Sequence, residues 1–217
     1  MKPETQFPIA HEGFPFIGIG AFLTFVAYLS FGWGGTATFL ALLTFFCVWF
    51  FRDPKRVVPE GNGLIVSPAD GTIVGIEKFY EEQFIGGPAL RVSIFLNVFN
   101  VHINRMPVEG EVVGVFYNPG RFFAANVPKA SLENEQNKIV VQTPWNDKKV
   151  IVIQIAGLIA RRIVCYARKG SKMKCGEHFG LIRFGSRVDL IIPVGTALRI
   201  KEGDVVYGGE TIFGELR

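Results

Sequence analysis

The feature that most constrains this chain is a stretch of 39 residues without a charged side chain, Gly13–Phe51. A bilayer-spanning helix needs about 20 apolar residues, so the stretch is too long for one ordinary helix. Gly32-Trp33-Gly34-Gly35 interrupts it with helix-breaking residues. We therefore expect a helical hairpin, with one helix over about Pro15–Phe31 and a second over about Thr36–Phe51.

This hairpin is best interpreted as a membrane anchor. Each helix would reach about 25 Å, which is short for a full crossing and leaves a re-entrant hairpin open. Arg52, Lys55 and Arg56 follow the second helix, which predicts the cell membrane with the rest of the chain on the cytoplasmic side. A cleaved signal peptide fits less well, because the apolar stretch is too long and only Lys2 precedes it as a basic residue. Buried core helices are the other alternative, but they rarely lack a polar face.

The remainder of the 217-residue chain predicts a mainly β domain over residues 53–217, after an N-terminal hairpin domain over residues 1–52. Short β-branched or alternating runs are separated by Gly, Pro, Asn and Asp, which is typical of two packed antiparallel sheets of a barrel-sandwich kind with few short helices. One short helix is conceivable within Arg121–Glu135. The net charge of +4 is too small to argue for nucleic acid. The expected strands are Gly71–Ile76, Leu90–Phe95, Gly110–Phe116, Lys138–Thr143, Lys149–Ile155, Arg162–Ala167, Val188–Ile192 and Ala197–Ile200.

Common cofactor and metal motifs are not found in the sequence. It has three Cys, no Cys-x-x-Cys and three His, so we expect no metal site and a reducing compartment. It also has no dinucleotide-binding, phosphate-loop or Gly-x-Ser-x-Gly motif.

One pair of residues could nonetheless carry unusual chemistry. Gly185-Ser186 lies between two strand-like runs, and a Gly leaves its carbonyl carbon open to attack by the neighbouring Ser186 hydroxyl. Such an attack converts the amide to an ester, elimination then leaves dehydroalanine, and hydrolysis gives an N-terminal pyruvoyl group. A plain β-turn is the commoner interpretation of Gly-Ser.

Two further segments hold candidate polar groups. Asn100, His102 and Asn104 would share one face of a strand and form a polar pocket, although a lone His on a strand is usually structural. Asp70 precedes Gly71, so it is either a turn former or the residue that orients a His in a Ser-His-Asp arrangement.

Together these segments resemble the phosphatidylserine decarboxylase family in its short, membrane-anchored prokaryotic form. Each matching segment is weak alone, but five in this order over about residues 50–217 are specific. They are Phe50-Phe51-Arg52-Asp53-Pro54, Ser67-Pro68-Ala69-Asp70-Gly71, Asn97–Pro107, Gly176-Glu177-His178-Phe179-Gly180 and Arg183-Phe184-Gly185-Ser186-Arg187-Val188-Asp189.

The resemblance implies a self-cleaving proenzyme, or zymogen. It would cut between Gly185 and Ser186 into a β chain, 1–185, and an α chain, 186–217, that begins with a pyruvoyl group made from Ser186. The pyruvoyl group would form a Schiff base with phosphatidylserine and act as an electron sink while CO₂ leaves, giving phosphatidylethanolamine. A lyase of phospholipid biosynthesis has a substrate that stays in the bilayer, which would explain the hairpin. A homodimer is compatible with the family.

This sequence departs from the family pattern at one catalytic position. Longer members have two His three residues apart before a Met-Pro pair, and here Arg105 stands where the second His would be. The base for self-cleavage is therefore either His102, which matches the His linked to decarboxylation, or His178, eight residues before Ser186 and conceivably across a hairpin. Ser186, His102, Asp70 and His178 are the catalytic candidates, and Asn104 and Arg105 are candidates for binding substrate.

Three other functions remain open from the sequence. A related phospholipid or a soluble amino acid derivative could replace phosphatidylserine as substrate. A non-enzymatic, membrane-anchored barrel-sandwich adaptor would have the same turn-rich C-terminus, and it predicts one intact chain. A binder of anionic surfaces could use a cluster of basic residues, although a solvated loop is the favoured explanation of them: Arg161, Arg162, Arg168, Lys169, Lys172 and Lys174.

Overall fold

The computed structural model of this chain describes residues 8–121, 133–145, 147–157, 162–183 and 186–216. The chain forms two compact units, Lys2–Lys55 and Arg56–Arg217. Each unit has its own internal packing. The domain boundary expected after residue 52 remains a proposal.

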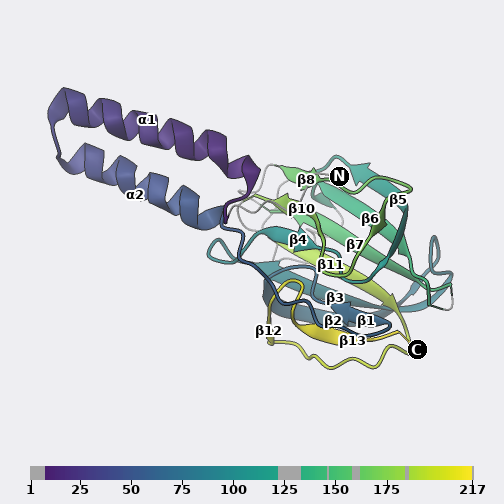
Figure 1. Cartoon of the computed structure of the whole chain (residues 1–217). Helices are drawn as coiled ribbons and strands as arrows, with labels where there is room; N and C mark the ends of the chain where they lie inside the picture. Colours follow the sequence, from purple (N-terminus) through teal and green to yellow (C-terminus); the bar gives the residue numbers. More distant parts are fainter. Residues whose placement is uncertain (1–7, 122–132, 146, 158–161, 184–185, 217) are drawn as a thin grey trace. The chain divides into compact units, whose positions relative to one another are not determined.

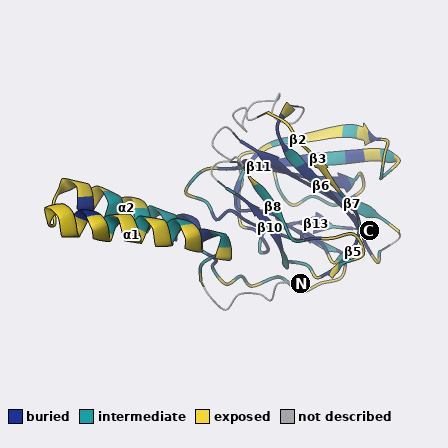
Figure 2. Ribbon diagram, turned by 90° about the horizontal axis from the view of Figure 1, so that it is seen from above, coloured by how far each residue is buried: buried dark blue, intermediate teal, exposed yellow. Residues whose placement is uncertain are grey.

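The N-terminal unit is the expected helical hairpin. A short 3₁₀ turn, η1 (His11–Gly13), leads into α1 (Phe14–Phe31), and α2 (Gly35–Phe50) follows the break at Gly32, whose φ is +70°. Continuous helix over His11–Phe31 is long and apolar enough to cross a membrane, whereas α2 has only 16 residues. Most apolar side chains of both helices are exposed, as Figure 2 shows. Exposure of this kind requires an apolar environment, which supports association with a membrane.

A small residue brings the two helices together. A Cβ on Gly20 of α1 would lie 2.5 Å from the hydroxyl oxygen of Thr44 on α2, so only glycine allows this approach. Thr24 and Thr44 donate their hydroxyls to the carbonyls of Gly20 and Leu40, one turn earlier. No polar group of these threonines therefore faces the apolar surroundings unpaired.

The described residues of the second unit form three antiparallel sheets (Figure 1). The largest has eight strands in the order β12-β2-β3-β11-β7-β6-β5-β9, a second has the order β4-β10-β8, and β1 pairs with β13. The strands are β1 (Leu64–Val66), β2 (Gly71–Glu81), β3 (Gly87–Leu96), β4 (Ile103–Arg105), β5 (Gly110–Asn118), β6 (Gln136–Gln142), β7 (Lys149–Ala156), β8 (Ile163–Cys165), β9 (Lys172–Met173), β10 (His178–Ile182), β11 (Ser186–Pro193), β12 (Val205–Val206) and β13 (Ile212–Glu215).

The large sheet is covered on both faces at its centre. Seven consecutive residues of β7 and seven of β11 are buried, which explains their continuous apolar runs. Side chains of one face, including Val188, Leu190 and Val152, join the main core. Side chains of the opposite face, including Ile191 and Ile153, form a smaller cluster under Phe79 and Phe84.

The sequence predicted the mainly β fold correctly, with some errors of detail. Seven of the eight expected strands overlap observed strands, but Ala197–Ile200 is not a strand. The strand around His102 is also shorter than expected: β4 contains only Ile103–Arg105, so Asn100 and His102 precede it. The helix expected within 121–135 falls mostly outside the described residues.

Candidate active site

Ser186 occupies the first position of β11, at the centre of the large sheet. Its backbone pairs with Leu96 of β3 on one side and Ala156 of β7 on the other. Residues directly opposite in an antiparallel pair point to the same face, so Ser186 faces the main core between these two side chains. Ser186 has no exposed surface, and its hydroxyl has no hydrogen-bond partner in the described part of the chain. A buried polar atom left unpaired costs about 1–3 kcal/mol, which favours a functional explanation. Gly185, the other half of the predicted cleavage site, lies outside the described residues.

A row of amide side chains lies on the same face of the sheet. Gln154 of β7 pairs with Val188 on β11, two residues along from Ser186, and with Asn137 on β6. Asn137 donates to Gln154 Oε1 at 3.0 Å, and Gln154 Nε2 donates to Asn104 Oδ1 at 2.8 Å. All three residues are at most 3% exposed. This row ties β4 of the small sheet to the face of the large sheet that carries Ser186.

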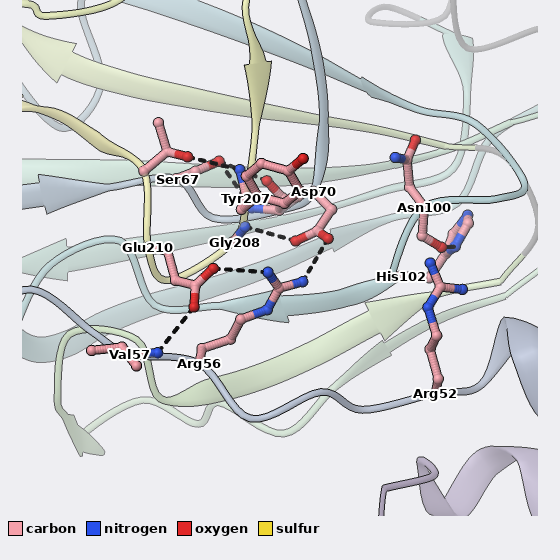
Figure 3. Close-up of polar contacts among 12 residues, drawn as sticks. Arg52, Arg56, Val57, Ser67, Asp70, Asn100, His102, Tyr207, Gly208 and Glu210 are labelled. Atoms are coloured by element: carbon pink, nitrogen blue, oxygen red, sulfur yellow. Dashed lines mark hydrogen bonds and ion pairs between the residues drawn. The ribbon is translucent and has the colours of Figure 1, made fainter.

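His102 directly precedes β4 of the small sheet. Its carbonyl accepts a hydrogen bond from Ile182, the last residue of β10, and the chain then passes from Ile182 to Ser186. His102 Nδ1 lies 2.9 Å from the Asn100 carbonyl oxygen, a contact drawn in Figure 3. A carbonyl only accepts, so Nδ1 carries the proton in the neutral ring and Nε2 is the atom that can take up another. His102 is 2% exposed.

Arg56, Asp70, Arg105, His178 and Glu210 gather elsewhere, and we call this set the arginine cluster. Figure 3 shows the Arg56 guanidinium between two carboxylates, at 2.6 Å from Asp70 Oδ2 and 2.9 Å from Glu210 Oε2. Asp70 Oδ1 accepts a 2.7 Å bond from the Gly208 amide. Arg105 donates to the Gly176 carbonyl and pairs across the strands with His178. Because Arg56 is buried in this cluster, it is not one of the exposed basic residues that would flank a membrane helix.

The charges of this cluster depend on burial as well as on pairing. Burial raises the pKa of Asp70 above its usual value, although the Gly208 amide and the Arg56 charge act to lower it. Burial and the nearby positive charge of Arg105 lower the pKa of His178 to about 4. His178 is therefore neutral at pH 7 and a weak base.

Neighbouring residues of β4 separate the candidate site residues into two groups. Successive side chains of a strand point to opposite faces. Asn104 reaches the face of Ser186 through Gln154, whereas Arg105 joins the arginine cluster with His178 and Asp70. The hairpin considered for His178 is not formed, because β10 and β11 lie in different sheets.

The sequence analysis missed three residues of these groups. Gln154 is an amide within an otherwise apolar run of β7, which was a usable signal, whereas Asn137 lies between Gln136 and Lys138 and gave none. No sequence pattern pointed to a role for Arg56 in a site. It follows an apolar helix closely, as basic residues at the end of a membrane helix do.

A buried serine whose hydroxyl has no partner among the described residues, at the start of an inner strand with amides on the same face, fits a self-processing class of protein. The chain matches the phosphatidylserine decarboxylase family over residues 43–214. It is 49% identical over 98% of its length to the phosphatidylserine decarboxylase proenzyme of Desulfotalea psychrophila, covering 99% of that protein. It is 46% identical to the proenzyme of the same name from Geotalea uraniireducens, over 96% of this chain and 97% of that protein. The chain therefore belongs to the phosphatidylserine decarboxylase family.

Proposed function

We propose that this protein is a self-cleaving proenzyme that decarboxylates phosphatidylserine to phosphatidylethanolamine. The observation that carries the proposal is the buried, unpartnered hydroxyl of Ser186 at the start of β11. Its support from relatives is the shared proenzyme name and the near-complete overlap in length.

Ser186 is the nucleophile of self-cleavage. Its Oγ attacks the carbonyl carbon of residue 185 and gives its proton to a base, and the peptide C–N bond breaks as the nitrogen takes a proton. Loss of the Ser186 α-proton then expels the carboxylate of residue 185. Water and the release of ammonia complete the conversion of residue 186 to a pyruvoyl group. The products are a β chain, 1–185, and an α chain, 186–217.

His102 is the better candidate for the base. Its carbonyl accepts a hydrogen bond from Ile182, four residues before Ser186 in the chain, and the Nδ1 contact with Asn100 makes Nε2 the nitrogen that takes up the proton. His178 begins β10, and Ile182 lies four positions further along the strand, about 13 Å at 3.3 Å per residue. Its lowered pKa also makes it a weak base. Asp70 and Arg105 lie with His178, so their proposed part is to hold the strands around the site.

The residues around Ser186 suit a pyruvoyl group. The face beside it holds apolar side chains, including Leu96 and Ala156, and the unpaired Asn104 amide nitrogen. When formed, the pyruvoyl group supplies an electron sink for the electron pair left by CO₂. His102 would give a proton to the substrate carbon, and burial of the site excludes water from it.

The hairpin brings this chemistry to its lipid. The apolar helix of residues 11–31 would hold the enzyme at the membrane, with the β domain on the cytoplasmic side. Arg52 and Lys55, which follow α2, are the remaining basic flank in support of that orientation. A homodimer is a further proposal that comes from the family alone.

Intact mass under denaturing conditions tests the proposal. Freshly expressed protein should give two chains that meet at residues 185 and 186, the smaller one lighter by one ammonia than a Ser-terminated fragment. Ser186→Ala should give one uncut chain and no CO₂ from phosphatidylserine vesicles. A cut Ser186→Ala chain would overturn the mechanism. A wild-type chain that stays whole during long incubation with membranes would favour the non-enzymatic adaptor instead.

A further inference from the structure

One backbone carbonyl fixes the orientation of the row of amide side chains formed by Asn137, Gln154 and Asn104. Besides Asn104, Gln154 Nε2 also faces the Val164 carbonyl oxygen of β8 at 3.3 Å. A backbone carbonyl can only accept, so this end of the Gln154 amide must be its nitrogen. Asn104 must then present its oxygen to Gln154. At the other end, Gln154 Oε1 receives the Asn137 amide.

Asn104 is consequently left with a donor that nothing in the described part of the chain uses. Its Nδ2 is buried and unpartnered, while Asn104 itself has no exposed surface. Ser186 Oγ is likewise buried and unpartnered, on the face of the sheet to which the row is attached. Asn104 is held against the face that carries Ser186 by its bond to Gln154, so its unpaired donor can serve a ligand with oxygen atoms.

We propose that Gln154 is a positioning residue that holds Asn104 as the hydrogen-bond donor for the carboxylate of the substrate. This inference rests on the proposed function and makes it more specific. A carboxylate only accepts hydrogen bonds, so it is recognised by Asn104 Nδ2 and repelled by Asn104 Oδ1. The orientation set by Gln154 therefore favours an amine that bears a carboxylate over the same amine without one.

Phosphatidylserine and phosphatidylethanolamine provide this comparison, because their headgroups differ by the carboxylate alone. Short-chain forms of each lipid are incubated with the processed full-length protein and a mild hydride reductant, which attaches the lipid covalently to the small chain. The mass gain of that chain is measured against lipid concentration. This readout requires no decarboxylation, and wild-type protein should label at lower concentration with phosphatidylserine.

Asn104→Asp keeps an acceptor for Gln154 and replaces the unpaired donor with an oxygen. We expect the half-labelling concentration for phosphatidylserine to rise about 10-fold or more, since hydrogen bonds to charged groups contribute about 1.5–3 kcal/mol. Labelling by phosphatidylethanolamine should stay the same. Gln154→Met removes the side chain that orients the Asn104 amide. It should raise the half-labelling concentration for phosphatidylserine about 3- to 10-fold. In a chain that already carries Asn104→Asp, Gln154→Met should not change the half-labelling concentration any further, because Gln154 acts through Asn104.

Gln142→Glu is the matched control, since Gln142 lies at the far end of β6 and contacts the carbonyls of Thr143 and Lys148. Self-cleavage measured on the same samples shows that each variant folds. Equal labelling of wild type and both variants by the two lipids would overturn the inference while leaving the proposed function intact. A wild-type chain that neither cleaves nor labels would instead overturn the proposed function.

Discussion

The lowered pKa of His178 predicts a specific loss of stability in acid. Its pKa is about 4 in the folded chain against an ordinary 6.5. Between these values the unfolded chain binds a proton that the folded chain does not, so stability rises with pH across this range. The contribution is complete above pH 6.5 and is lost as the pH falls toward 4. The difference corresponds to about 3.4 kcal/mol at 1.36 kcal/mol per pKa unit. Because the ring is only half-buried, solvent screening reduces our expectation to about 2 kcal/mol.

His178→Gln tests this directly, because glutamine stays neutral at every pH. Folded fractions of the full-length chain in detergent are measured by pulse proteolysis in a urea series at pH 7 and pH 4.5. This pH interval covers about 70% of the titration, so wild type should lose about 1.4 kcal/mol more than the variant between these conditions. His11→Gln, in the N-terminal unit, is the control and should behave as wild type. Parallel acid sensitivity in wild type and His178→Gln would refute the reasoning.

Three further predictions concern packing and buried charge, each measured by pulse proteolysis in urea. Gly180→Ala should cost about 1–3 kcal/mol, because its Cβ would lie 2.1 Å from the Val164 carbonyl oxygen; an unchanged stability would contradict this contact. Arg187→Met should cost about 3–5 kcal/mol by leaving Asp189 buried without its two hydrogen bonds, and Asp189→Asn in the same chain should recover part of this loss. Arg56→Lys should lower the free energy of unfolding by about 1–2 kcal/mol, because one ammonium replaces a guanidinium that contacts two carboxylates. A loss equal to that of Arg56→Ala would show that the two-pronged guanidinium contact is unimportant.

Local patterns predicted the elements of the fold better than their pairing. The uncharged stretch and Gly32 were sufficient for the hairpin, and alternation or apolar runs were sufficient for seven strands. The shortest strands, such as β1 and β12, were missed because two or three residues carry no period. Ala197–Ile200 has a strand-like composition but forms no ladder.

The sequence named individual candidate residues for the site, but it did not predict their division into two groups. Strand alternation placed Asn104 and Arg105 on opposite faces, but it did not show which residues each face would meet. Strand pairing sends one toward Ser186 and the other toward Asp70 and His178. Long-range contacts of this kind depend on register between β4 and β10, which no local motif encodes.

The position of β11 has a consequence for the protein after cleavage. The last 32 residues supply an inner strand of the large sheet between β3 and β7, an edge strand beside β2, and the partner of β1. A cut before Ser186 would thus be a nick in an intact domain, whose small fragment is interwoven with the large one at three separate places. The two fragments should copurify through gel filtration without any covalent link. They should come apart only when the whole domain unfolds, and mixing the separated peptides afterward would require the sheet to rebuild around its own middle strand.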